Sequence, residues 1–233
     1  MQGPGAAIGG LGGRNLFTYD VRTGAVTQVT SLSRPSPGSP LSFLNTFDVA
    51  GPAWAPDGAR ILVVAHVGGV QNVKPTPCGS NVRSYELLLV TPAGGLDRWL
   101  TCTQGIGATG QVLNQEPAWP LDGQTVIFRR ATNTTLQGDL YAARPGDPVD
   151  GTTGVPPRTR LTATDPATEQ TPSGAPDQIT VAFASDRTGV FHLYTLSRAG
   201  ALPATDYAAT CLTCGNPLGI VEAGDPAWSP GLP

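Results

Sequence analysis

A short phrase that occurs four times constrains the fold of this chain more than any other feature of its sequence. Residues 52–58 read Pro-Ala-Trp-Ala-Pro-Asp-Gly, residues 117–123 read Pro-Ala-Trp-Pro-Leu-Asp-Gly, and residues 226–231 read Pro-Ala-Trp-Ser-Pro-Gly. A weaker copy at 172–177 reads Pro-Ser-Gly-Ala-Pro-Asp. Self-similarity at such spacings is typical of repeat architectures, in which each copy is one supersecondary unit. We therefore expect a protein built from four repeated units.

A strand-like run follows each of the first three copies along the chain. The runs cover 59–65, 124–129 and 178–184, and each contains Ile, Val or Phe. Asp-Gly between two extended segments predicts a tight hairpin turn, because Gly accepts a positive φ and the Asp carboxylate bonds nearby amides. Apolar side chains occupy both faces of 61–65, which indicates a sheet that is covered on both sides.

Two further elements recur in the same order within each unit. The third element begins with Leu inside a β-prone run, and the fourth element ends with Thr after a polar segment. The pairs are Leu16 with 29–30, Leu87 with 100–101, Leu140 with 161–162, and Leu193 with 212–213. The complete pattern predicts four strands per unit.

The composition agrees with an all-β chain. The 233 residues include 30 Gly and 23 Pro, too many for a helical protein, so we expect one domain, residues 1–233, with little or no helix. Charged residues make up 13% and the net charge is -3, which leaves no basic face for a phosphate backbone. We expect no nucleic-acid partner. No apolar run approaches the roughly 20 residues that cross a bilayer, so we expect no transmembrane segment.

The ordered pattern resembles the TolB-like β-propeller repeat. That consensus joins Pro-x-Trp-Ser-Pro-Asp-Gly, an apolar strand ending in Ser-x-Arg-x-Gly, an Ile/Leu-Tyr strand, and Leu-Thr. Residues 184–194, which run from Ala-Ser-Asp-Arg-Thr-Gly to Leu-Tyr, match the middle of it closely. The chain departs from it at Gly174, where Trp is expected, at 120–121, and through insertions at 67–83 and 145–157. The resemblance implies a β-propeller.

The two ends of the chain indicate how such a ring would close. A degraded second strand near 6–9 precedes the first Leu and Thr elements, and a first element stands at the C-terminus. We predict that the C-terminal strand joins the N-terminal strands in one blade, which hides the sheet edges. The result is four blades of four antiparallel strands: 1–30 plus 224–231, 50–103, 115–163, and 170–214. A fragment of a larger ring, or a ring completed by two chains, is the alternative.

The repeated aromatic and acidic residues are interpreted as structural. An aspartate in the turn bonds backbone amides, and a tryptophan at one fixed place in each unit packs between blades. The residues assigned to these roles are Trp54, Asp57, Gly58, Trp119, Asp122, Gly123, Asp177 and Trp228. We predict no catalytic, cofactor-binding or metal-binding residue. His66 and His192 are too few for a three-histidine zinc centre, and there is no nucleophile elbow or phosphate loop.

The four cysteines indicate disulfides rather than zinc. A zinc site would have to join Cys78 and Cys102 to Cys211 and Cys214, yet Cys102 and Cys214 hold the same place in blades that face each other across a four-bladed ring. The inserted loop that carries Cys78 can fold back on Cys102, and a Cys211 to Cys214 bridge requires the chain to turn at 214–217.

Two such bridges predict a location in the periplasm or outside the cell. The start of the chain lacks a secretory signal, which fits either a cytosolic protein or the mature form of an exported one. The disulfides favour the exported form.

Long loops with little charge predict a protein-interaction scaffold. The loops cover 31–48, 67–83 and 144–160, and binding residues concentrate on loops held by a rigid framework. The resemblance implies a non-catalytic extracytoplasmic subunit that docks on a membrane-associated or cell-envelope assembly, as a monomer or within a larger hetero-assembly.

The alternatives are a carbohydrate-active or peptidase-associated propeller enzyme, and a propeller that binds a glycan or small ligand. An enzyme would use carboxylates just ahead of the repeated phrase as acid and base. The chain offers four there: Asp48, Glu116, Glu169 and Asp225.

Overall fold

The structure is a computed structural model that describes residues 14–30, 49–67, 84–102, 112–120, 122–132, 137–150, 155–197, 208–215 and 224–228. These residues form strands β1 to β14 and no helix, so the expectation of an all-β chain is confirmed. In this part of the chain there is accordingly no helix long and apolar enough to cross a membrane.

The strands group into four consecutive units. Unit 1 consists of β1 (Phe17–Tyr19) and β2 (Val26–Gln28). Unit 2 consists of β3 (Val49–Trp54), β4 (Ile61–Val67), β5 (Ser84–Val90) and β6 (Leu96–Trp99). Unit 3 consists of β7 (Val112–Ala118), β8 (Val126–Thr132), β9 (Gly138–Ala143) and β10 (Arg158–Arg160). Unit 4 consists of β11 (Glu169–Gly174), β12 (Thr180–Ser185), β13 (His192–Ser197) and β14 (Ala209–Cys211).

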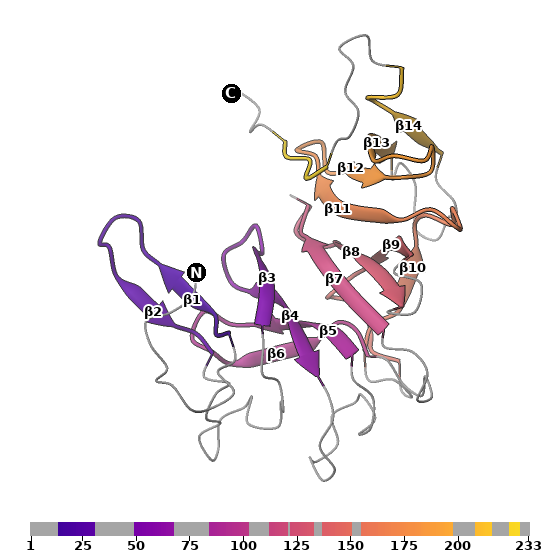
Figure 1. Ribbon diagram of the computed structural model, residues 1–233. Coiled ribbons are helices and arrows are strands. Elements are labelled where there is room, and N and C mark those ends of the chain that lie inside the picture. Colours follow the sequence, from indigo (N-terminus) through magenta and orange to yellow (C-terminus); the bar gives the residue numbers. More distant parts are fainter. Residues whose placement is uncertain are drawn as a thin grey trace, which may run out of the picture.

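Within each unit, successive strands pair antiparallel in chain order. Units 2 and 3 are also joined by a short parallel pairing of β5 with β7. The units follow one another along an arc, with β1 and β2 at one end and unit 4 at the other (Figure 1). The first strands β3, β7 and β11 contact one another in that order. The arc is therefore built by stacking one unit onto the next through its first strand.

The core lies between the units, as the sequence of β4 shows. Ile61, Val63 and Ala65 pack into a cluster shared with unit 1, whereas Leu62 and Val64 pack into a cluster shared with unit 3. The two sets alternate along β4 because successive side chains of a strand point to opposite faces. Full burial of a Val or Leu side chain is worth about 1.5–3 kcal/mol, so both faces of this sheet contribute to stability.

The Leu and Thr elements form the same hydrogen bonds in all four units, an arrangement that we call the Leu–Thr clasp. The Leu N–H donates to the Thr hydroxyl, and the residue before the Thr donates its N–H to the Leu carbonyl. The Leu N to Thr Oγ1 distances are 2.8 Å for Leu16 and Thr30, 2.8 Å for Leu87 and Thr101, 2.9 Å for Leu140 and Thr162, and 3.0 Å for Leu193 and Thr213. The clasp fastens the chain beyond the fourth strand to the third strand.

The aspartates of the repeated phrase lie in the turns between first and second strands. Asp57 Oδ1 accepts a hydrogen bond from Ala59 N at 2.9 Å, and Asp122 and Asp177 accept from the amides two and three residues further on. The residue after each aspartate has a positive φ, at Gly58, Gly123 and Gln178. Each carboxylate therefore fixes a turn.

The tryptophans of the phrase have different surroundings. Trp119 lies beneath the guanidinium of Arg60, 5.6 Å from the ring centroid, and so packs between units 2 and 3. Trp54 is 50% exposed. Trp54 belongs to unit 2, and unit 1, which precedes it, has only two strands among the described residues. Trp228 donates from Nε1 to the carbonyl of Ser173 at 3.0 Å, so the C-terminal segment lies against β11.

The structure explains one departure from the repeat. A side chain at Gly174, where Trp is expected, would bring a Cβ within 2.7 Å of Pro120 Cβ and Cγ. Pro120 itself stands where the consensus has Ser. The two departures are therefore coupled across the contact between units 3 and 4.

The predicted closure of the ring is not confirmed. Residues 224–228 form no strand and pair with neither β1 nor β2 in the described part of the chain. They lie against β11, the first strand of unit 4, and β11 in turn lies against β7, the first strand of unit 3. Closure into four blades stays a prediction.

Candidate functional site

The two ends of the sheets differ in the length of the connections that they carry. Because successive strands within a unit are antiparallel, β2, β4 and β6 all finish at one end of the sheets. Strands β3, β5 and β7 all begin at that same end. The connections 31–48, 68–83 and 103–111 all leave from this end, which we call the long-connection end. The Asp-Gly turns lie at the opposite end, the turn end, and the connection from β13 to β14 also lies there.

One of the three predicted binding loops lies at the turn end. The segment 144–160 follows β9, which ends there, and its last residues form β10. Arg98 donates from Nη1 to the carbonyls of Pro145 and Asp147, so the start of the segment is fastened to unit 2. Of the three loops that the sequence offers for binding, two, at 31–48 and 67–83, therefore connect strands at the long-connection end.

A polar residue precedes the Leu of every clasp, and its side chain contacts the clasp Thr hydroxyl. The distances to the Thr Oγ1 are 3.3 Å for Asn15, 2.6 Å for Glu86, 3.3 Å for Asp139 and 3.0 Å for His192. These side chains lie at the long-connection end, because each stands at or near the start of a third strand. Sequence reasoning missed this position, although a polar residue before Leu recurs in all four copies.

Units 2 and 3 are joined by a buried polar group around Glu86. Its carboxylate is fully buried and accepts from Thr101 Oγ1 and, at 3.0 Å, from Asn114 Nδ2. Asn114 Oδ1 in turn accepts from Arg130 Nη1 at 3.0 Å. Burial lowers the pKa of Arg130 below its usual value, with the nearby Arg158 acting in the same direction. A buried carboxylate is tolerated only when its oxygens are bonded in this manner.

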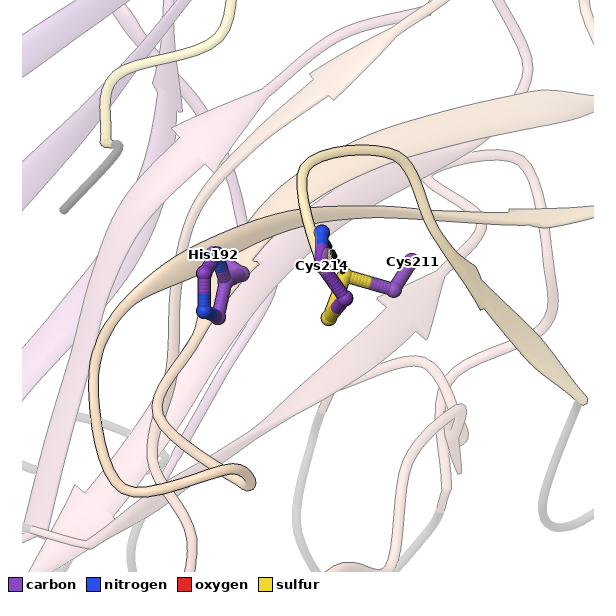
Figure 2. A group of neighbouring side chains, drawn as sticks. All are labelled: His192, Cys211 and Cys214. Carbon is purple, nitrogen blue, oxygen red and sulfur yellow. Dashed lines mark hydrogen bonds between the residues drawn. A yellow bond between two sulfur atoms is a disulfide. The ribbon is translucent and has the colours of Figure 1, made fainter. Parts of the chain in front are cut away.

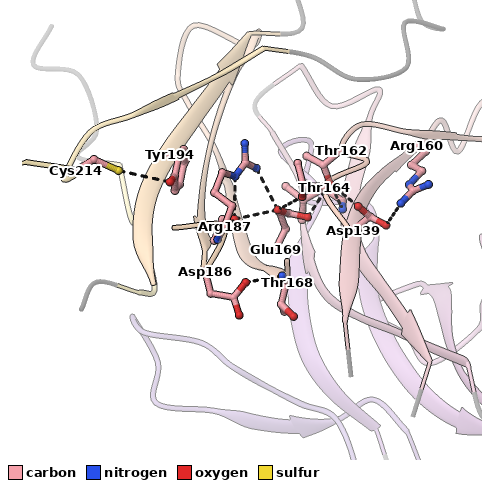
Figure 3. Close-up of polar contacts among 12 residues, drawn as sticks. Asp139, Arg160, Thr162, Thr164, Thr168, Glu169, Asp186, Arg187, Tyr194 and Cys214 are labelled. Carbon is pink, nitrogen blue, oxygen red and sulfur yellow. Dashed lines mark hydrogen bonds and ion pairs between the residues drawn. The ribbon is translucent and has the colours of Figure 1, made fainter. Parts of the chain in front are cut away.

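Units 3 and 4 are joined by a similar group around Glu169 (Figure 3). This carboxylate is also fully buried, and it accepts from Ser185 Oγ at 2.9 Å and Arg187 Nη2 at 3.1 Å. The hydroxyls of Thr162 and Thr164 lie at 3.2 Å and 2.5 Å from it. All four of these partners are side chains of the protein.

Asp139 lies beside this group and is paired with Arg160. Burial raises the pKa of the Asp139 carboxyl above its ordinary value, and the hydrogen bond and charge of Arg160 oppose that rise. The raised pKa means that removal from water outweighs the ion pair.

The structure gives the carboxylates considered for catalysis separate surroundings. Glu116 accepts from Thr171 N at 2.7 Å and lies 3.8 Å from Arg129, Glu169 is enclosed as described, and Asp225 is exposed. Asp48 lies outside the described residues. Glu116 and Glu169, the two of these candidates that form hydrogen bonds described above, have no partner in common.

A backbone feature accounts for the residue that stands before each proline of the phrase. Gly51, Glu116, Thr171 and Asp225 all have φ near 50°. In β3, β7 and β11 the pairing register shifts at this point, which is the signature of a β-bulge. The bend of the first strand therefore accounts for the backbone conformation at this position.

Described residues line a pocket near unit 1 and another at the turn end. One of about 500 Å³ lies between units 1 and 2 and is lined by β1, β3 and Val63, with Arg14 as its titratable residue. The other, of about 290 Å³, lies at the turn end beside Arg60, Arg144 and Asp147. Neither pocket, in the part of the chain that the structure describes, brings two carboxylates together.

The cysteines of unit 4 form a disulfide. Cys211 and Cys214 have Cα atoms 5.6 Å apart, within the limit for a bridge, because the chain turns after β14. Cys102 is also disulfide-bonded, and Cys78 lies outside the described residues. The side chain of His66 is likewise outside them, whereas His192 lies beside the Cys211–Cys214 bridge (Figure 2).

Four-stranded antiparallel units that stack through their first strands define a protein of the β-propeller class. The chain is similar to TolB from Acinetobacter baumannii, with a TM-score of 0.50 and 18% identity over 85% of this chain and 37% of that one. It is also similar to a puromycin-hydrolyzing peptidase from Mycobacterium tuberculosis, with a TM-score of 0.51 and 14% identity over 85% of this chain and 27% of that one.

These likenesses support a TolB-like propeller fold. The chain spans well under half of either protein's length. No protein-family model matches the sequence, and a comparison with curated proteins found no match.

Proposed function

We propose that this chain is a non-catalytic protein-interaction scaffold that binds its partner at the long-connection end. The observation that carries the proposal is the distribution of connections. Segments 31–48, 68–83 and 103–111 connect strands at one end of the stack of sheets, whereas the Asp turns lie at the other end, together with the connections that follow β9 and β13. Loops on a fixed framework are where binding residues concentrate.

The use of the polar side chains supports a scaffold over an enzyme. Glu86 and Glu169 are fully buried and bonded to neighbouring units, so they join sheets together. General acid–base catalysis needs a carboxyl within reach of a substrate. The charged groups inside the described sheets are committed to structure.

The location that we propose is outside the cytosol, in association with a membrane or cell-envelope assembly. The Cys211–Cys214 disulfide and the bonded state of Cys102 support an oxidising compartment. The resemblance of the repeat to TolB-like propellers supports the envelope assembly.

Affinity purification from membranes of the source cells, in mild detergent, tests the proposal. The tagged chain should recover a protein partner in a stable ratio. A variant in which 33–46 is replaced by a short Gly-Ser linker should lose it, because that segment leaves from the long-connection end. The matched control replaces Val21 and Arg22, which are exposed in the turn between β1 and β2, with Ser, and it should keep the partner. Recovery of the chain alone, or equal loss from both variants, would contradict the proposal.

A second candidate is the propeller part of a peptidase, which the likeness to the puromycin-hydrolyzing peptidase favours. In that case the partner at the long-connection end would be a hydrolase domain. Assay of the affinity-purified material with an aminoacyl anilide separates the two functions. Release of the amine by the recovered complex, and not by the chain alone, would favour the peptidase.

A further inference from the structure

Three potential metal ligands meet at the long-connection end of unit 4. A ring nitrogen of His192 and the sulfurs of Cys211 and Cys214 all lie within 4.8 Å of one another (Figure 2). His192 begins β13, whereas the cysteines stand at the end of β14 and just beyond it. Tyr194 pairs directly with Cys211 across the two strands, so the sheet itself brings the imidazole beside the Cys-x-x-Cys segment.

The Leu–Thr clasp holds the imidazole in place. Thr213, between the two cysteines, accepts from Leu193 N at 3.0 Å and contacts His192 Nδ1 at 3.0 Å. A neutral imidazole carries its proton on one ring nitrogen, so the ring nitrogen without a proton keeps its lone pair for a metal. The equivalent residues of units 1 to 3 are Asn15, Glu86 and Asp139, so unit 4 places a histidine where the repeat needs only a polar side chain.

The surroundings of the two sulfurs suit thiolates. Cys214 N donates to Cys211 Sγ at 2.9 Å, and the hydroxyl of Tyr194 lies 3.5 Å from Cys214 Sγ. Gly215 has a φ of 69°, so the chain turns sharply after the second cysteine. Hydrogen bonds to sulfur stabilise its charged form, and two cysteines separated by two residues are a recurring half of zinc sites.

The two cysteines lie at the surface of unit 4. Cys214 is exposed and Cys211 is half-buried. A small dithiol would transfer two electrons to the bridge, becoming a disulfide itself while Cys211 and Cys214 become thiols. A zinc ion would then displace the two thiol protons to solvent and take both thiolates and the neutral imidazole as ligands.

We propose that Cys211, Cys214 and His192 form a zinc(II) site when the disulfide is reduced, with water in the fourth position. Two thiolates and an imidazole form a ligand set that zinc prefers, and three protein ligands leave one position open. The site goes beyond the proposed scaffold function: it forms only where a dithiol reduces the bridge, and the oxidised chain of the proposed compartment would not hold it.

Cobalt(II) provides a spectroscopic probe of this site. The purified chain is reduced with a phosphine, cleared of metal and titrated with Co²⁺. We expect one ion per chain, with near-ultraviolet thiolate-to-cobalt absorption and the visible bands of tetrahedral cobalt, both abolished by added Zn²⁺. The oxidised chain is the matched control and should show neither.

Variants assign the ligands. His192→Asn introduces the residue that unit 1 has at this position, so the clasp contact is kept while a ligand is lost, and affinity should fall at least about tenfold. Cys211→Ser with Cys214→Ser should abolish the absorption. The proposal is overturned if the oxidised chain binds cobalt equally, if His192→Asn binds as tightly as the natural chain, or if the double serine variant keeps the signal.

A measurement on the unaltered chain guards against variants that do not fold. Zn²⁺ should protect Cys211 and Cys214 of the reduced chain from alkylation by iodoacetamide, as read by peptide mass spectrometry. Equal alkylation of these two cysteines with and without Zn²⁺ would also overturn the site.

Discussion

Gln178 has a left-handed backbone conformation that most side chains disfavour. Its φ is 66°, and the equivalent turns have Gly58 at 68° and Gly123 at 63°. A non-glycine residue in this region costs about 1–2 kcal/mol, partly offset by the greater freedom of Gly in the unfolded chain. Gln178→Gly should therefore raise the free energy of unfolding by up to about 1 kcal/mol, measured by urea denaturation. Gly58→Gln is the reciprocal control and should lower it; a loss of stability in Gln178→Gly would refute this account of the turn.

Asp139 gives a pH dependence whose sign follows from its raised pKa. A carboxyl with a folded pKa above its unfolded value of about 3.8 binds its proton more tightly in the folded state. Its contribution to stability is complete below pH 3.8 and declines as the pH rises through the folded pKa. The unfolding free energy of the natural chain minus that of Asp139→Asn should therefore fall as the pH rises across that window. Urea denaturation from pH 3 to pH 7 measures it, and a value that rises with pH would show that the Arg160 pair dominates instead.

At this scale the sequence predicts local chemistry well and tertiary contacts poorly. The turn role of Asp57 follows from its own neighbours, Pro56 and Gly58. The reason for Gly174 is a contact with Pro120 in the preceding unit, and no local pattern reveals it. The role of Glu169 also depends on Arg187 and Ser185, which only the folded sheet brings to it.

Among the elements, the Leu–Thr clasp makes a testable contribution to stability. Thr101 is fully buried, accepts from Leu87 N and donates to Glu86. Thr101→Val keeps the shape but leaves a buried N–H and a carboxylate without this partner, at a cost of about 1–3 kcal/mol for each unsatisfied group. Denaturant unfolding should show at least that loss. Thr27→Val, at an exposed position of β2, should change stability by less than about 0.5 kcal/mol. Equal effects of the two substitutions would contradict the clasp.

The contact between units 3 and 4 predicts the effect of adding one methyl group. Gly174→Ala places a Cβ 2.7 Å from two carbons of Pro120, and the strain of such overpacking is about 1–3 kcal/mol. Gly146→Ala meets no atom within 4 Å and should be nearly neutral. Thermal unfolding followed by circular dichroism compares the two. A stable Gly174→Ala variant would mean that the units are not pressed together at this point.

The order of the elements could be predicted because each carries its own signal, from the Asp turn to the Leu and Thr pair. The end of the sheet at which a loop emerges was harder to predict from the sequence. The segment 144–160 is long and rich in Pro and Gly like the other two, yet β9 runs in the direction that places it at the turn end. Strand direction decides this, and it depends on the pairing of the whole unit.

For the whole molecule, the sequence predicts a propeller and the structure supports that class, while ring size remains a prediction. The repeats in the sequence show how many units the chain has. They do not show what lies between its first and last units. Trp228 against β11 and the half-exposed Trp54 mark the two faces at which a closing blade would have to pack. A native mass equal to that of one chain, 24.0 kDa, would agree with a ring closed within the chain. The mass of a defined oligomer would not.

The central claim is that the long-connection end is the end that binds a partner. Site-specific photo-crosslinking tests it directly, with a photoreactive amino acid at one exposed position at a time. Thr188 and Val190, between β12 and β13, lie at the long-connection end, whereas Ala59 and Ile179 lie at the turn end. We predict adducts with a protein partner from Thr188 and Val190 in living cells, and none from Ala59 and Ile179. Adducts from the turn end alone would contradict the account.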